Sequence, residues 1–216
     1  PATAVASQVA PIQMADKGEW PFQVALLTSD MLDQDPNSQP DSQFCGGSLI
    51  APNWVLTAAH CVSDGVEPVP ANSVTILSEA THLSEGKRYE VLQIIAHEGY
   101  STSTLDNDIA LIRLASDATA PTINMPAGPS EDAGKVTVTG WGMMEDGTFP
   151  NDLMEAELEL VPNAACNDGI RQIYARDLGL ILRDIGLRMR YSEDAVNAAT
   201  TTLAATMGDA LTGNMI

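Results

Sequence analysis

The chain has 216 residues, enough for one substantial globular domain or two small ones with a buried core. Apolar residues make up 44% of it, a composition that excludes intrinsic disorder and a membrane-embedded chain. It carries 10 lysines and arginines against 29 aspartates and glutamates, a formal net charge of −19, which excludes nucleic acid and anionic membrane surfaces as partners of the whole chain. No stretch approaches eighteen uninterrupted apolar residues, and the first thirty lack the pattern of an export signal, so we expect a soluble chain from which any such signal has been removed.

Short apolar runs separated by turn residues fill residues 20–161 and are typical of an antiparallel barrel or sandwich. Residues 30–42 form a polar stretch, and residues 121–134, rich in Pro, Gly and Ala, are a candidate linker between two lobes. We predict strands over residues 22–27, 47–50, 54–58, 73–77, 89–96, 109–114, 135–140 and 153–161.

The apolar period changes after residue 168, where apolar residues recur at steps of three and four from Ile170 to Met189. This spacing predicts one face of a helix. Ser192, followed by two acidic residues and an Ala-rich run to about Met207, predicts the N-cap of a second helix. We therefore expect a β-rich body with an α-helical segment near residues 168–210.

Three cysteines, Cys45, Cys61 and Cys166, are an odd number, so they cannot all be paired within the chain. If Cys45 and Cys61 were bridged, they would close a loop of about 16 residues and stabilise the fold by roughly 3 kcal/mol. Cys166 would then be left without a partner.

Two residues carry the candidate chemistry. His60 follows an apolar strand and a small-residue turn and directly precedes Cys61, and Asp108 stands at the start of another apolar strand. Taken alone, a histidine beside a strand is more often structural, and an acid at a strand start is more often a turn residue. Its place at the mouth of the strand predicts that the carboxylate of Asp108 is half-buried and accepts a hydrogen bond.

Seven segments stand in order along the chain, at residues 18–24, 44–50, 54–61, 97–100, 108–114, 136–142 and 161–166. Together they resemble the trypsin/chymotrypsin-like serine proteases. The resemblance implies an all-β fold of two antiparallel β-barrels, the second incomplete in this chain, with the helical segment as an insertion. We accordingly expect an amino-terminal segment over residues 1–17, a first barrel over 18–126, and a partial second barrel over 127–216 with the insertion at 168–210.

By this resemblance His60 is the general base and Asp108 the carboxylate that orients it, in a Ser-His-Asp triad. The resemblance also implies a disulfide between Cys45 and Cys61, which holds the histidine turn, and a partner for Cys166 beyond residue 216. No Gly-Asp-Ser-Gly-Gly segment occurs in the 216 residues, so we expect the serine in a separate or missing carboxyl-terminal part.

The leading hypothesis is therefore a secreted or periplasmic serine endopeptidase that acts on protein or peptide substrates. The alternative is a non-catalytic, protease-like binding or regulatory protein. The large helical insertion and the amino end permit it. These enzymes are usually activated from a zymogen by cleavage after a basic residue, which frees an Ile or Val amine, but here Gln8 precedes the matching position near Val9 and no glycine pair follows it. We expect no cofactor. We also expect no metal, because Glu79, Glu85 and Glu90 show no spacing that would bring oxygens together around calcium.

The helical segment holds five of the ten cations, Arg171, Arg176, Arg183, Arg188 and Arg190. An amphipathic helix packed on its own barrel, with a solvated arginine face, would explain them. Alternatively, Arg176, Arg183 and Arg188 form a candidate exosite for a protein partner, since they would present a basic face on an acidic protein.

Overall fold

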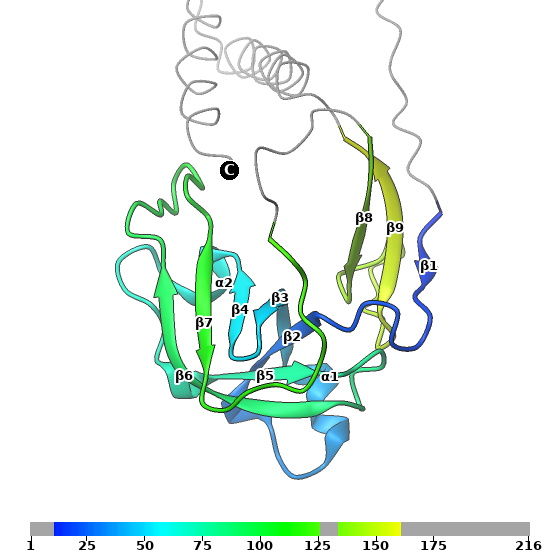
Figure 1. Ribbon diagram of the computed structural model, residues 1–216, viewed down its shortest axis with the longest axis horizontal. Coiled ribbons are helices and arrows are strands. Elements are labelled where there is room, and N and C mark those ends of the chain that lie inside the picture. The colour runs from blue at the N-terminus through cyan, green and yellow to red at the C-terminus, as the bar shows by residue number, and fades with distance from the viewer. Residues whose placement is uncertain (1–10, 126–133, 161–216) are drawn as a thin grey trace, which may run out of the picture. The chain divides into compact units, whose positions relative to one another are not determined.

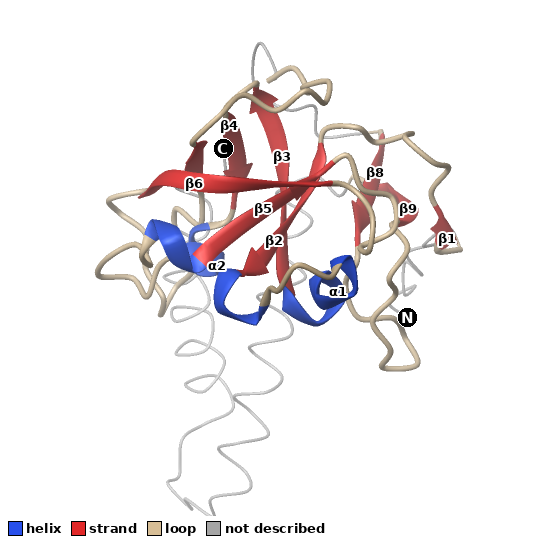
Figure 2. Cartoon of the chain, turned by 90° about the horizontal axis from the view of Figure 1, so that it is seen from below, coloured by secondary structure: helices blue, strands red, loops and turns tan. Residues whose placement is uncertain are grey.

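The computed structural model describes residues 11–125 and 134–160. Residues 11–125 and 135–159 belong to one of the two compact units into which the chain divides, and strands dominate that unit (Figures 1 and 2). Its strands are β1 (Gln13–Met14), β2 (Gln23–Thr28), β3 (Gln43–Ala51), β4 (Trp54–Thr57), β5 (Val74–Ser78), β6 (Lys87–Ala96), β7 (Ala110–Leu114), β8 (Lys135–Gly140) and β9 (Met154–Glu159). Its helices are short: η1 (Ser29–Met31), η2 (Pro36–Ser38), α1 (Gln39–Ser42), α2 (Ala59–Val62) and η3 (Ala71–Ser73).

Six strands close into an antiparallel barrel in the order β2-β3-β4-β7-β6-β5, with β5 returning to pair with β2. Closure leaves none of these six strands with a free edge for pairing with another molecule. Buried and more exposed side chains alternate along a strand that is covered on one face. In β7, Ala110, Ile112 and Leu114 are buried, whereas Arg113 is exposed.

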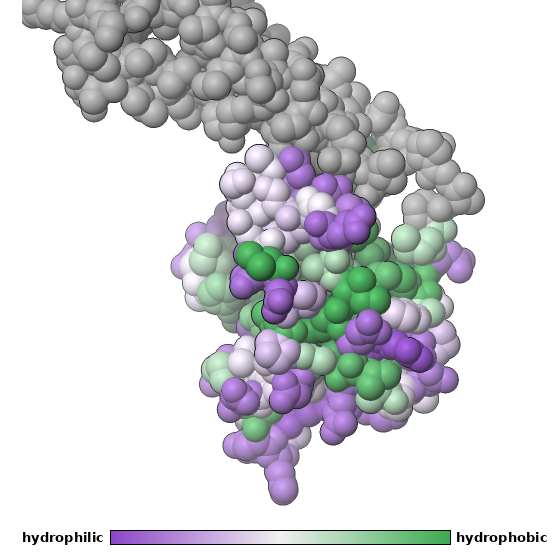
Figure 3. Space-filling view, turned by 90° about the vertical axis from the view of Figure 1, so that its left-hand side faces the viewer, coloured by the Kyte–Doolittle hydropathy of each residue, from purple (hydrophilic) through white to green (hydrophobic). Residues whose placement is uncertain are grey.

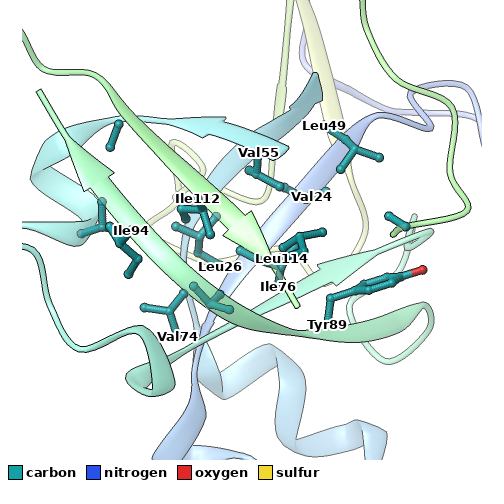
Figure 4. Close-up of a cluster of buried hydrophobic side chains, with 14 of the residues drawn as sticks. Val24, Leu26, Leu49, Val55, Val74, Ile76, Tyr89, Ile94, Ile112 and Leu114 are labelled. Carbon is teal, nitrogen blue, oxygen red and sulfur yellow. The ribbon is translucent and has the colours of Figure 1, made fainter. Parts of the chain in front are cut away.

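The β2 strand is buried on both faces, and its alternation separates two clusters of core residues. Val24 and Leu26 point into the barrel, where they pack with the side chains shown in Figure 4, while Ala25 and Leu27 belong to a second cluster. A strand that is covered on both faces consists of consecutive apolar residues. This explains why residues 22–27 show an apolar run and not an alternation of apolar and polar residues.

The second sheet has three strands in the order β1-β9-β8 (Figure 1). Trp141, which follows β8, and Leu153, which precedes β9, are both 2% exposed and pack in the second cluster with Ala25, Leu27 and Leu77 of the barrel. A hydrogen bond also joins the two sheets, because Oγ1 of Thr139 donates to Oε1 of Gln23 over 2.8 Å.

The all-β fold class is confirmed, and each of the eight predicted strands has a counterpart among β2 to β9. The prediction missed β1, since two residues show no periodicity. Residues 30–42 are also more ordered than a polar loop, because Asp35 caps η2 and the side chains of Gln39 and Ser42 are buried. The predicted helices and the remainder of the second barrel lie outside the described residues.

The described surface mixes apolar and polar residues, and on the face drawn in Figure 3 hydrophobic patches lie between hydrophilic ones. Two of the exposed apolar side chains, Leu92 and Ile95, belong to β6. A search of the described part of the chain finds no helix long and apolar enough to cross a membrane.

Candidate active site

The barrel brings His60 and Asp108 together although 48 residues separate them. His60 lies in α2, just after β4 ends, and Asp108 lies just before β7 begins. Because β4 and β7 are antiparallel and Thr57 pairs with Ala110, the end of one strand lies beside the start of the other. The two side chains are therefore delivered to the same end of the barrel.

Nδ1 of His60 lies 2.7 Å from Oδ2 of Asp108, and the backbone N–H of His60 donates to Oδ1 over 2.7 Å. An ionised carboxylate can only accept hydrogen bonds, so Nδ1 carries the proton and Nε2 keeps a free lone pair. The side chain of His60 is 55% exposed, against 25% for that of Asp108. The arrangement thus presents an oriented, solvent-accessible base backed by a half-buried acid.

Asp108 is held in its charged form. Burial acts to raise the pKa of this carboxyl. The hydrogen bonds from the imidazole and the backbone of His60, the charge of His60 and a hydrogen bond from the backbone of Ala59 all act to lower it. Together they outweigh burial, so the pKa of Asp108 lies below its ordinary value. In its ionised form Asp108 fixes the tautomer of the imidazole and would stabilise the protonated imidazole.

The turn before Asp108 depends on an unusual backbone conformation. Asn107 has φ of 55°, in the left-handed region, where asparagine is better tolerated than most residues. Its Nδ2 donates to the carbonyl of Gly99 over 3.0 Å, which ties this turn to the neighbouring loop. Asn107 is not among the predicted site residues, although its place between two aspartates in a turn is a usable signal.

The disulfide between Cys45 and Cys61 is confirmed, and it joins β3 to α2 with a Cα–Cα distance of 6.2 Å. It pins the short helix that carries His60 to the wall of the barrel. Sγ of Cys61 lies 3.5 Å from Nε2 of His60, so the bridge also lines one side of the imidazole.

The sequence model of the trypsin family matches residues 11–180. The chain belongs to the trypsin family. Two curated members similar to it are Trypsin Blo t 3 of Blomia tropicalis, 36% identical over 163 residues, and brachyurin of Leptuca pugilator, 35% identical over 158 residues. The alignments cover 71% and 68% of this chain and 55% and 62% of those proteins.

Among solved structures, the VesB protease of Vibrio cholerae is similar, with a TM-score of 0.61 and 34% sequence identity over 74% of this chain and 47% of that one. This trypsin-family chain therefore spans about half the length of the relatives that it matches.

His82, which is not among the predicted site residues, is half-buried and forms a β-bridge with Asp152. Glu79 accepts hydrogen bonds from the hydroxyls of Tyr89 and Thr119. Cys166 and the candidate exosite residues Arg176, Arg183 and Arg188 lie outside the described residues.

Proposed function

We propose that this chain is part of a serine endopeptidase, in which His60 is the general base, Asp108 orients it, and the nucleophilic serine comes from a segment outside the 216 residues. The single observation that carries the proposal is the 2.7 Å contact between Nδ1 of His60 and Oδ2 of Asp108. Membership in the trypsin family supports the same reaction, hydrolysis of peptide bonds in a protein or peptide substrate.

In this mechanism the lone pair on Nε2 of His60 takes the proton from the serine hydroxyl as the oxygen attacks the scissile carbonyl carbon. The imidazolium that forms is stabilised by the adjacent carboxylate, and it then gives the proton to the leaving amine. Water deacylates the enzyme by the same route, with His60 again acting as base. The Cys45–Cys61 bridge contributes by holding α2, because small displacements of a base reduce the rate strongly.

The disulfide and the relatives support an extracellular or periplasmic location, where thiols become oxidised. The amino end, where Gln8 stands in place of a basic residue and no glycine pair follows Val9, permits the alternative of a protease-like protein without catalysis. The two functions differ in whether the serine becomes reactive.

The deciding experiment labels a polypeptide that combines this chain with the serine segment, using a serine-directed fluorophosphonate. Labelling that is lost in His60→Ala but retained in His97→Ala would support the endopeptidase, since only His60 contacts Asp108. His97 is a matched control because it is also an exposed histidine, and its backbone N–H donates to the carbonyl of Ile109, the residue after Asp108. Equal labelling of both variants, or none in the parent, would reject the proposed role of His60.

A further inference from the structure

Three connecting segments of the barrel line a pocket of about 250 Å³: the turn before β2, the turn after β5 and the segment after β7. Hydrogen bonds join these segments to one another. The backbone N–H of Gly18 donates to Oγ1 of Thr81 over 3.1 Å, and Oγ1 of Thr119 donates to Oε1 of Glu79 over 2.6 Å. The walls of the pocket are therefore held in place by contacts of their own.

Glu79 supplies an oriented carboxylate in this pocket. Its backbone has φ of 64°, in the left-handed region, which is unfavourable for a residue with a side chain. Positions strained in this way recur at binding sites, where the surrounding structure holds them. The hydroxyls of Tyr89 and Thr119 both donate to Oε1 of Glu79, over 3.2 Å and 2.6 Å. Among the described residues none donates to Oε2, so this oxygen remains able to accept a hydrogen bond from a ligand.

Trp20 supplies an aromatic wall. Its Nε1 donates to Oε2 of Glu155 over 2.7 Å, and its ring meets that of Phe22 edge-on, with 6.1 Å between the ring centroids. These two contacts fix the orientation of the indole. The other apolar residues that line the pocket are Pro21, Ala80, Ala120 and Pro121.

The charges in the pocket favour a cationic ligand. Lys17 is the one basic residue among the described lining residues, and its Nζ is paired with Oε2 of Glu85 over 2.9 Å. Glu79 is the one acidic residue of that lining, and no described lysine, arginine or histidine forms an ion pair with it. The net charge of −19 on the whole chain adds a general attraction for a basic partner.

We propose that this pocket binds the side chain of an arginine exposed on a partner protein. A guanidinium group donates to carboxylates and stacks on aromatic rings, and Glu79 and Trp20 offer these two groups. The volume agrees with a single side chain, because it is smaller than the about 300–1,000 Å³ of pockets that hold whole drug-sized molecules.

The pocket lies at the opposite end of β7 from the pair of His60 and Asp108. Asp108 stands just before β7, a strand about 13 Å long, whereas Thr119 follows its other end. There the backbone N–H of Thr119 donates to the hydroxyl of Tyr89, which precedes the β6 partner of Leu114. Under the proposed function, the pocket is an exosite that anchors a protein substrate away from the bond to be cleaved. This consequence rests on the proposed function, whereas the binding itself does not.

The test titrates the isotope-labelled 216-residue chain with N-acetylarginine methylamide and follows the backbone amide signals by NMR. We expect the signals of Gly18 and Thr119, whose N–H groups donate within the pocket wall, to shift and to saturate. The corresponding citrulline compound has nearly the same shape but no charge. It should bind at least about 3-fold more weakly, because its hydrogen bonds to the carboxylate lack the assistance of a positive charge.

A variant and a matched control test the role of the carboxylate. Glu79→Gln should weaken binding of the arginine compound about 3- to 10-fold, because it removes the charge but keeps an oxygen that can accept from Tyr89 and Thr119. Glu90→Gln is the control, since Glu90 is also exposed, follows Tyr89 on β6 and does not line the pocket. It removes the same charge and should bind like the parent.

Three results would overturn the proposal: no saturable shift at Gly18 or Thr119, a citrulline compound that binds as tightly as the arginine compound, or equal affinities of Glu79→Gln and Glu90→Gln. Because the titration involves no cleavage of a peptide bond, its failure is distinguishable from failure of the proposed endopeptidase.

Discussion

A side chain on Gly47 would collide with Val55 on the neighbouring strand. A Cβ at Gly47 would lie 2.8 Å from Cγ1 of Val55 and 2.9 Å from the carbonyl oxygen of Leu56, both closer than real contacts allow. At the adjacent Gly46 the nearest atom is Nε2 of Gln23, 3.1 Å away at the end of a flexible side chain. β3 therefore requires glycine more strictly at position 47 than at position 46. Gly47 lies only two residues after Cys45 of the disulfide.

We expect Gly47→Ala to destabilise the fold by about 1–3 kcal/mol, the usual cost of overpacking a close-packed core. Gly46→Ala should change stability by less than about 1 kcal/mol, because Gln23 can move aside and alanine also restricts the unfolded chain. Denaturant unfolding of the two variants measures the difference. Equal losses in both would show that the contact with Val55 does not decide the residue at 47.

Gln39 joins three segments from a buried position. It is 3% exposed, its Nε2 donates to the carbonyls of Leu83 and Glu85, and its Oε1 accepts from Nε of Arg88. Gln39→Leu should cost about 1–3 kcal/mol, since it leaves polar groups unpaired in a buried place. Gln93→Leu, at an exposed position of β6, should cost much less in the same unfolding measurement. A similar cost in both would count against this role for Gln39.

The barrel strands were predictable because burial imposes a period on them. β7 buries Ala110, Ile112 and Leu114 in strict alternation, and β2 is apolar throughout because both faces are covered. The order in which strands pair is not in that pattern. It depends on contacts such as those of β2 with β5, which are distant in sequence and have no local signal.

The site was predicted only in part, because its residues act through neighbours that carry no motif. His60 and Asp108 were found from their motifs, but the left-handed Asn107 that shapes the turn was not. The backbone N–H groups of Ala59 and His60, which hold the carboxylate of Asp108, belong to residues of any type and leave no trace in the sequence. The approach of His60 to the disulfide likewise depends on the position of α2 against β3.

Glu155 ties the amino-terminal strand to β9. One carboxylate oxygen accepts from Nε2 of Gln13 over 2.6 Å and the other from Nε1 of Trp20 over 2.7 Å, and these bonds lower the pKa of the carboxyl. Glu155→Ala should release β1, so that the amide of Ala15, which donates to the carbonyl of Leu153, exchanges its hydrogen several-fold faster. Hydrogen exchange followed by mass spectrometry measures this rate.

The control for Glu155 is Glu157→Ala on the same strand. Glu157 pairs with Lys135 of β8, on the side away from β1, so its loss should leave the exchange of the Ala15 amide unchanged. The same acceleration in both variants would indicate a general loosening of β9 and contradict a specific anchor at Glu155.

The contact between His60 and Asp108 should make stability depend on pH in the acidic range. The pKa of Asp108 is lower in the folded protein than in the unfolded chain, where it is about 3.9. The ionised carboxylate therefore contributes its full stabilisation above that unfolded-state pKa. This contribution is lost as the pH falls through the lower pKa of the folded state. The unfolding free energy of the parent minus that of Asp108→Asn should therefore be largest near neutral pH and shrink below about pH 4. Denaturant unfolding from about pH 6 to about pH 3 measures this difference, and Asp117→Asn, which removes the same formal charge at an exposed position, is the control. A difference that stays constant or grows towards low pH would mean that the hydrogen bonds from His60 do not favour the ionised form of Asp108.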